Sequence, residues 1–220
     1  VHRGTRLSLG RVEGRTLRCP YHGWVYDGSG RCIHVPAQPD SPPPSRAKVT
    51  AYRAVECHGL IWVCLGEPRR DPPPFPEWAD PSFRKLLCGP YPVEASGPRI
   101  VENFLDVAHF AFVHESILGT PERPEIADYA ASITEEGVEA KGVRVWQPDP
   151  YGTGQGDWVS YTYRALRPLT AYLFKESEGP RFSILLTITP HAPARSTAWM
   201  WMAMNYGHDL PAEDLIAWQD

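Results

Sequence analysis

The sequence comprises 220 residues, of which 42% are hydrophobic and 22% charged, and 22 Lys and Arg against 26 Asp and Glu give a net charge of −4. This composition is typical of a globular protein with a buried core and excludes an intrinsically disordered chain. The slightly acidic balance gives no reason to expect nucleic acid or an anionic membrane as a partner. No apolar run reaches the ~18 residues of a transmembrane helix, so no membrane span is expected.

The first part of the chain is predicted to form short strands and turns. Asp27-Gly28-Ser29-Gly30 is a strong hairpin signal between two apolar segments. Further strands are predicted over 49–55 and 60–65, joined by a turn at His58-Gly59. Proline, with 24 residues, argues against an all-helical bundle, and its density over 67–76 indicates a connector between domains.

The second part combines one helix with long strands. Val101, Phe104, Leu105 and Ala108 have the apolar spacing of a helix over 100–109. A second helix is predicted to start at Pro211. Strands are predicted over 142–146, 158–164, 171–174, 182–189 and 197–205. A helix against a large antiparallel sheet indicates an α+β fold.

The ends and the cysteines suggest the context of the chain. It starts at Val1 without Met or an apolar signal segment and stops at Asp220 soon after a predicted helix start. We therefore expect a piece of a longer protein that lacks both ends. The five cysteines are odd in number and have no disulfide-like spacing, so we expect a reducing, cytoplasmic location.

Cys19-Pro20-Tyr21-His22-Gly23-Trp24 places a thiolate and an imidazole on one loop, and sixteen residues separate His2 from Cys19. A packed Cys/His pair and a structural zinc site are the alternatives for such residues. The full string resembles the Rieske iron–sulfur domain, in which Cys-x-His precedes Cys-x2-His. The resemblance implies that His2, Cys19 and His22 bind a 2Fe-2S cluster. The fourth ligand, a Cys, is then expected just upstream of Val1.

A second group of polar side chains follows in the predicted helix. Asn103, Asp106 and His109 recur every three residues and are expected on one helix face, whereas His114 would lie about 140° further around a regular helix. Both imidazoles can bind one metal only if the helix ends or distorts near 110–113. Two His and a carboxylate form the facial triad of non-haem Fe(II) oxygenases. An amphipathic helix with polar surface residues is the alternative.

Asp-x2-His-x4-His downstream of a Rieske motif resembles the Rieske non-haem iron oxygenases, the alpha subunits of the aromatic-ring-hydroxylating family. Val-Glu-Asn-Phe-Leu-Asp-Val-Ala-His-Phe, from Val101 to Phe110, is most similar to the vanillate O-demethylase and pheophorbide a oxygenase branch. The resemblance implies an all-β Rieske domain over 1–67, a connector over 68–89 and a helix-grip catalytic domain with an antiparallel sheet over 90–220.

The resemblance also implies a role for each polar residue. His109 and His114 match the iron ligands, and Asp106 matches the carboxylate that hydrogen-bonds a Rieske histidine of a neighbouring subunit, here His22. Asn103 matches a polar residue near the iron. The third iron ligand is an aspartate, for which Asp220 is the late candidate and a residue beyond it the expected one.

The implied activity is the hydroxylation or oxidative demethylation of an aromatic or related hydrophobic substrate with O2. Electrons would pass from a ferredoxin or flavin reductase through the cluster to mononuclear Fe(II), in a homotrimer. The alternative is a Rieske electron-transfer protein without oxygenase activity, which leaves Asp106, His109 and His114 unexplained. A zinc-bearing binding module is a further alternative.

Overall fold

The computed structural model describes residues 4–151, 153–176 and 179–217, and the chain divides into two compact units, Val1–Pro72 and Pro73–Asp220. Within the described ranges, no helix is both long and apolar enough to cross a membrane. The prediction of domain boundaries at 67 and 89 stays a prediction.

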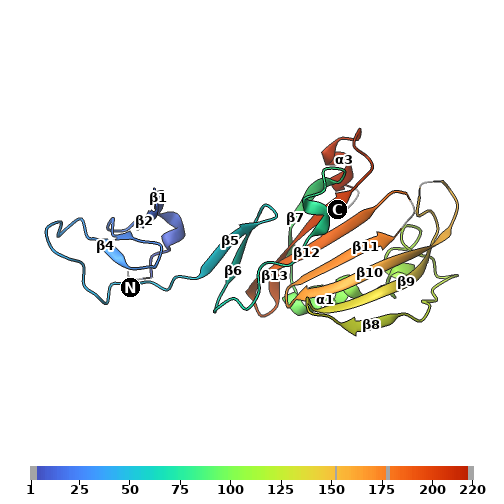
Figure 1. Ribbon diagram of the computed structural model, residues 1–220, viewed down its shortest axis with the longest axis horizontal. Coiled ribbons are helices and arrows are strands. Elements are labelled where there is room, and N and C mark those ends of the chain that lie inside the picture. Colours follow the sequence, from blue (N-terminus) through green and yellow to red (C-terminus); the bar gives the residue numbers. More distant parts are fainter. Residues whose placement is uncertain (1–3, 152, 177–178, 218–220) are drawn as a thin grey trace. The chain divides into compact units, whose positions relative to one another are not determined.

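The first unit is built from short antiparallel strands, coloured blue to cyan in Figure 1. A 3-10 helix, η1, precedes a four-stranded sheet of order β1-β2-β3-β4, and β5 and β6 form a separate hairpin. The bounds are η1 Leu7–Leu9, β1 Arg11–Glu13, β2 Thr16–Arg18, β3 Val25–Tyr26, β4 Cys32–His34, β5 Arg53–Cys57 and β6 Leu60–Cys64.

Turn chemistry fixes the two predicted hairpins of this unit. Oδ1 of Asp27 accepts hydrogen bonds from the backbone N–H groups of Ser29 and Arg31 at 2.9 and 3.1 Å. His58 and Gly59 both have positive φ, 53° and 66°, as a type I′ turn requires. The hairpins are confirmed, although β5 starts four residues later than predicted, at Arg53.

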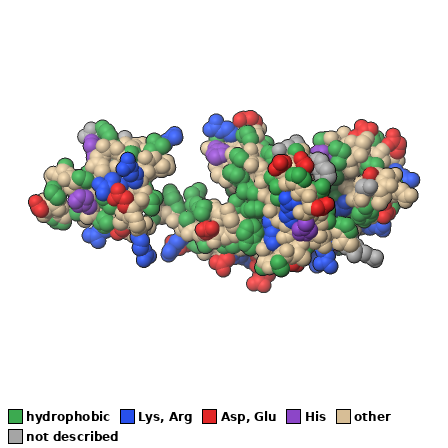
Figure 2. Space-filling view, turned by 90° about the horizontal axis from the view of Figure 1, so that it is seen from above, with side chains coloured by type: hydrophobic (Ala, Val, Ile, Leu, Met, Phe, Trp, Pro, Cys, Tyr) green, Lys and Arg blue, Asp and Glu red, His purple; other side chains and the backbone are tan. Residues whose placement is uncertain are grey.

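The β5–β6 hairpin exposes apolar side chains. Val55, Ile61 and Val63 are 50%, 69% and 58% exposed, and Figure 2 shows hydrophobic side chains gathered over this part of the chain. The two strands pair only with each other among the described strands, so each has an open edge.

In its described residues, the second unit is a seven-stranded antiparallel sheet of order β7-β13-β12-β11-β10-β9-β8, with three helices and one 3-10 helix (Figure 1). This arrangement confirms the predicted α+β fold. The strands are β7 Arg84–Val93, β8 Ala130–Ile133, β9 Val138–Gln147, β10 Asp157–Arg167, β11 Thr170–Glu176, β12 Phe182–Ala192 and β13 Arg195–Met204. The helices are η2 Pro76–Trp78, α1 Gly97–Leu105, α2 Phe110–Val113 and α3 Ala212–Ala217.

Two strands of this sheet were not predicted. Strand β7 begins inside the segment interpreted as a connector and contains Pro90 and Pro92, which are unusual in strands. Strand β7 lies at one edge of the sheet and pairs with β13 on one side. Its other side faces no strand of the sheet, so the missing N–H of a proline costs no hydrogen bond there. Strand β8 has four exposed residues and lacks the apolar alternation that would have marked it.

The sheet has two differently covered faces. One face, called the inner face here, packs Val107 and Phe110 against Tyr161, Tyr163 and Met202. Helix α1 lies against this sheet and contacts β10, β11, β12 and β13. On the opposite, outer face, Phe75 and Phe83 pack against Tyr172 and Leu185. The segment around η2 thus covers the outer face, while α1 and α2 belong to the inner face.

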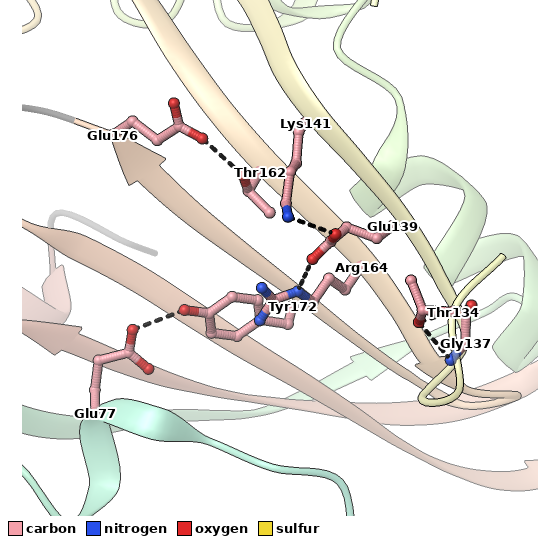
Figure 3. A network of polar contacts seen from close by, with 9 residues as sticks. All are labelled: Glu77, Thr134, Gly137, Glu139, Lys141, Thr162, Arg164, Tyr172 and Glu176. Atoms are coloured by element: carbon pink, nitrogen blue, oxygen red, sulfur yellow. Dashed lines mark hydrogen bonds and ion pairs between the residues drawn. The ribbon is translucent and has the colours of Figure 1, made fainter. Parts of the chain in front are cut away.

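A chain of polar contacts crosses the outer face (Figure 3). The Tyr172 hydroxyl donates to Oε1 of buried Glu77 at 2.7 Å, and the Arg164 guanidinium lies 5.3 Å from the Tyr172 ring centre. Nε of Arg164 donates to Glu139 at 2.6 Å, and Lys141 pairs with the same carboxylate at 2.9 Å. Side chains of η2, β11, β10 and β9 are therefore linked across the sheet.

Candidate functional site

The helix that carries the second polar group ends earlier than predicted. Helix α1 stops at Leu105, because Asp106 adopts extended angles of φ −82° and ψ 120°. Its Oδ1 accepts a hydrogen bond from the Ala108 N–H at 2.7 Å, a local turn that competes with helix continuation. The prediction of one helix over 100–109 is confirmed as far as Leu105 and wrong beyond it, so Asp106 and His109 lie past the helix end.

The break brings the two histidines together. His109 immediately precedes the four-residue helix α2, and His114 immediately follows it. Their ring centroids are 5.2 Å apart, and the Phe110 ring lies edge-on against both. Burial, with a smaller contribution from His109, lowers the pKa of His114 and so favours the neutral imidazole that binds metals. The expected interruption of the helix is present, but it lies at Asp106 and not at 110–113, which form helix α2.

The Asp106 carboxylate lies beside Nδ1 of His109. Its Oδ2 lies 3.4 Å from Nδ1 of His109, whose side chain is 16% exposed. That nitrogen is buried and forms no hydrogen bond within the described part of the chain. A carboxylate beside Nδ1 favours a proton there and leaves the Nε2 lone pair for a metal.

Asn103 is exposed on α1. Its described contact with this group is made by the backbone, since its carbonyl accepts a hydrogen bond from the Asp106 N–H at 3.3 Å. Its predicted place on a shared helix face with Asp106 and His109 is wrong, because the helix has ended before both of them.

Gly119 is a residue of the site that sequence reasoning missed. It is buried against α2, where a Cβ at this position would lie 2.8 Å from Cα and N of Ala111. The Gly119 carbonyl also accepts a hydrogen bond from the Ser116 N–H at 2.9 Å. The turn after His114 can therefore return close to the short helix only with a residue that has no side chain.

The loop between β2 and β3 holds Cys19 and His22. The Cys19 N–H donates to the Trp24 carbonyl at 2.8 Å, and the Cys19 carbonyl accepts from Gly23, which has a φ of 70°. Cys19 is 1% exposed, whereas His22 is exposed and its ring centroid lies 3.9 Å from that of Tyr21. The loop thus presents one buried thiol and one exposed imidazole.

The described residues supply two donors to each predicted metal site. His2, the further predicted cluster ligand, and Asp220, the late candidate for the iron, both lie outside the described residues. Among the residues that are described, no group of three His, Cys, Asp or Glu assembles around one point. The assignments of His2, Cys19, His22, His109 and His114 as ligands stay predictions.

Comparison with known proteins adds an independent line of evidence. Residues 1–74 match the family model of the Rieske [2Fe-2S] domain, and residues 93–217 match that of the vanillate O-demethylase oxygenase C-terminal domain. The second match covers more than half of the chain. The chain belongs to the Rieske oxygenases of the vanillate O-demethylase type.

Individual members of this Rieske oxygenase family are similar to this chain in sequence and fold. The methylxanthine N1-demethylase NdmA of Pseudomonas putida is 44% identical over 127 residues, which are 57% of this chain and 36% of that protein. The vanillate O-demethylase oxygenase subunit of a Pseudomonas species is 35% identical over 56% of this chain and 38% of its own. The structure of NdmA with caffeine superposes with a TM-score of 0.82 at 30% identity, over 98% of this chain and 65% of that one.

The residues matched by sequence therefore make up little more than a third of these two relatives. Family membership implies a Rieske 2Fe-2S cluster and a mononuclear iron as cofactors. The residues present fit both groups. The loop of Cys19 and His22 offers the mixed thiolate and imidazole donors of a Rieske cluster. The imidazole rings of His109 and His114, whose centroids are 5.2 Å apart, suit one iron.

Proposed function

We propose that this chain forms the Rieske and catalytic domains of an oxygenase that hydroxylates or oxidatively demethylates a planar aromatic substrate with O2. The observation that carries the proposal is the pairing of His109 and His114 across a four-residue helix, with Asp106 at Nδ1 of His109. The alternative of a Rieske electron carrier gains no support, because residues 93–217 match an oxygenase domain.

The proposed cluster ligands are His2, Cys19 and His22, and the proposed iron ligands are His109 and His114. When bound, the cluster would supply single electrons and the iron would supply oxygen activation. Asp106 would fix the tautomer of His109 and link it to a cluster histidine of a neighbouring subunit in a homotrimer. Asn103 is retained as a polar residue near the iron, although its side chain is exposed.

The inner face supports a hydrophobic aromatic substrate. Phe110 lies against both histidines, and its ring is 6.4 Å from that of Tyr161, which in turn is 5.7 Å from Tyr163. Aromatic side chains favour edge-to-face and offset contacts with other rings. The names of the relatives point to flat ring compounds as well: methylxanthine, vanillate and toluene-4-sulfonate.

The proposed domains are 1–67 for the Rieske domain, 68–89 for the connector and 90–220 for the catalytic domain. Two compact units that meet at Pro72 and Pro73 support this organisation. The proposed electron donor is a ferredoxin or flavin reductase. Over 72 residues the chain is 51% identical to the oxidoreductase NdmD of Pseudomonas putida, which supports a link to redox proteins of this kind. The proposed location is the cytoplasm.

Metal analysis and electron paramagnetic resonance of the full-length holoenzyme test the proposal. Reduction should give the signal of a Rieske cluster, and iron should exceed the two atoms of that cluster. His109→Ala should lose the additional iron and turnover but keep the cluster signal. Turnover by His109→Ala at the wild-type rate would contradict the iron assignment, and zinc in place of a cluster would contradict the Rieske assignment.

A further inference from the structure

Tyr172, on the outer face of the sheet, differs from the other buried tyrosines in the group beside its hydroxyl. The four buried tyrosines that the structure describes are Tyr26, Tyr161, Tyr163 and Tyr172. The Tyr172 hydroxyl donates to Oε1 of Glu77 at 2.7 Å (Figure 3), a length typical of a bond to an ionised carboxylate. The hydroxyls of Tyr26 and Tyr163 have no hydrogen-bond partner among the described groups, and the Tyr161 hydroxyl accepts from an amide. Within the described residues, Tyr172 is therefore the buried phenol with a proton acceptor in place.

Glu77 is free to take the proton that Tyr172 presents to it. The Glu77 side chain is buried, and its Oε2 has no hydrogen-bond partner among the described groups. None of the described ion pairs includes this carboxylate. Transfer of the Tyr172 proton to Glu77 would therefore break no other side-chain hydrogen bond or ion pair of Glu77 in the described part of the chain.

The surroundings of Tyr172 disfavour the loss of its proton alone or of an electron alone. Burial and the neighbouring Glu77 raise the pKa of Tyr172, so the phenolate does not form in the physiological range. Loss of an electron alone would leave a positive charge on a buried ring, 5.3 Å from the Arg164 guanidinium. Loss of both leaves a neutral ring and a neutral carboxylic acid, because the proton moves along the existing hydrogen bond.

Aromatic side chains connect Tyr172 with the surface of the second unit. The Phe75 ring lies 6.4 Å from the Tyr172 ring and 6.4 Å from the Trp78 ring. The Trp78 ring in turn lies edge-on to Trp201 at 5.2 Å. Both tryptophans are partly exposed. Single electrons pass readily between rings at such separations, and an indole that has lost an electron oxidises a phenol whose proton has an acceptor. An oxidant in solvent can therefore reach Tyr172 through the two tryptophans.

We propose that Tyr172 and Glu77 form a one-electron redox site that intercepts oxygen-centred radicals. One electron passes from Tyr172 through Trp78 and Trp201 to the radical, which becomes an anion. The O–H bond of Tyr172 breaks, and its proton forms an O–H bond with Oε1 of Glu77. A thiol or ascorbate then returns one electron, and the Glu77 proton restores the phenol. The protective role rests on the proposed function, since O2 reduction without product formation would be the source of such radicals, whereas the chemistry of the site does not require the iron.

Oxidation of the full-length holoenzyme by hexachloroiridate(IV), a one-electron oxidant, tests the proposal. Radicals on exposed tyrosines combine rapidly, so electron paramagnetic resonance is recorded after seconds, when a buried tyrosyl radical should remain. Tyr172→Phe should remove this lasting signal. Glu77→Gln keeps an oxygen that can accept the hydrogen bond but no longer takes the proton, so radical formation should slow at least about tenfold. Tyr163→Phe is the matched control, a buried tyrosine without a described acceptor, and should leave the signal unchanged.

A lasting signal of equal size in Tyr172→Phe would overturn the site, and an unchanged rate in Glu77→Gln would overturn the role of the carboxylate. A measurement on the wild-type protein is independent of how the variants fold. The proton held by Glu77 should remain hydrogen-bonded to the radical oxygen, so electron–nuclear double resonance should detect a proton coupling that exchanges in D2O. A tyrosyl signal without this coupling would also overturn the proposal.

Two further results separate the parts of this inference. Trp201→Phe should slow radical formation, and an unchanged rate would overturn the route through the tryptophans. Iron content is measured on the same samples. A lasting radical in protein without mononuclear iron would overturn the proposed function and leave the redox site standing, whereas full iron content without a radical would overturn the redox site alone.

Discussion

The phenol of Tyr172 in β11 donates a 2.7 Å hydrogen bond to the buried carboxylate of Glu77 in η2. The second oxygen of Glu77 is buried and has no hydrogen-bond partner among the described groups. Burial and the neighbouring Glu77 raise the pKa of Tyr172, so the phenol remains a donor throughout the physiological range. This bond fastens the segment that covers the outer face to the middle of the sheet.

Tyr172→Phe should lower the free energy of unfolding by about 1–3 kcal/mol, because a buried carboxylate loses its donor. Denaturant unfolding measures the change. Combining Tyr172→Phe with Glu77→Gln should cost less than the sum of the single changes, since the two residues share one interaction. Tyr129→Phe, at an exposed tyrosine, is the control. Additive effects of the two changes would contradict the coupling.

The second prediction concerns alkaline pH. Burial raises the pKa of Tyr161 from 10.0 to about 12, against a smaller opposite effect of the Gln147 hydrogen bond. A phenol with a raised pKa in the folded protein contributes stability that is complete below pH 10 and is lost between pH 10 and about 12. The loss amounts to about 3 kcal/mol over this range.

Tyr161→Phe should therefore show a weaker decrease in unfolding free energy between pH 10 and 12 than the wild-type protein. Urea unfolding at a series of pH values gives this difference. Parallel pH profiles for the two proteins would show that Tyr161 ionises as readily in the folded chain as in the unfolded one.

A third prediction separates the charge of Asp106 from its role in the turn. Asp106→Asn retains an oxygen that can accept the Ala108 N–H but removes the negative charge beside Nδ1 of His109. In the full-length holoenzyme we expect near-normal iron content and a chemically reducible cluster. Product formed in a single turnover should fall at least about tenfold, in the range of other changes to groups that orient metal ligands.

Asp106→Ala removes both functions and should additionally reduce iron content, because the turn that places His109 loses its hydrogen bond. Normal single-turnover product from Asp106→Asn would contradict the proposed link between the two metal sites.

The fourth prediction tests the close approach of Gly119 to α2. In Gly119→Ala the new methyl group would lie 2.8 Å from the Ala111 backbone, so either the turn or the short helix must move. We expect a loss of about 1–3 kcal/mol in stability and a reduced iron content, measured by metal analysis. Gly179→Ala is the matched control, since a Cβ there meets nothing within 4 Å. Equal iron content in the two variants would contradict a role for Gly119 in placing the histidines.

Local chemistry explains which parts of the fold could be predicted. The hairpin at Asp27 depends on one side chain and its adjacent glycines, and long strands such as β10 show their apolar pattern directly. Strand β7 could not be recognised, because its prolines are acceptable only at a sheet edge, and its edge position depends on β13, more than one hundred residues away.

In the candidate site, too, features that depend on local residues could be predicted and features that depend on tertiary contacts could not. The residue types and spacing of Asp106, His109 and His114 indicated a metal site, and the need for a helix break near 110–113 followed from helix geometry. The actual break at Asp106 could not be derived, because the same Asp can continue a helix or cap its end. The sequence around Gly119 did not indicate its role, since that role depends on a contact with the backbone of Ala111.

The hairpin of β5 and β6 has a practical consequence for anyone who produces the first unit alone. Val55, Ile61 and Val63 are at least half exposed, and both strands have free edges within the described part of the chain. Free edges with apolar side chains favour strand addition from other molecules. Preparations of residues 1–72 should therefore self-associate as concentration rises, and a lysine in place of Ile61 should keep them monodisperse.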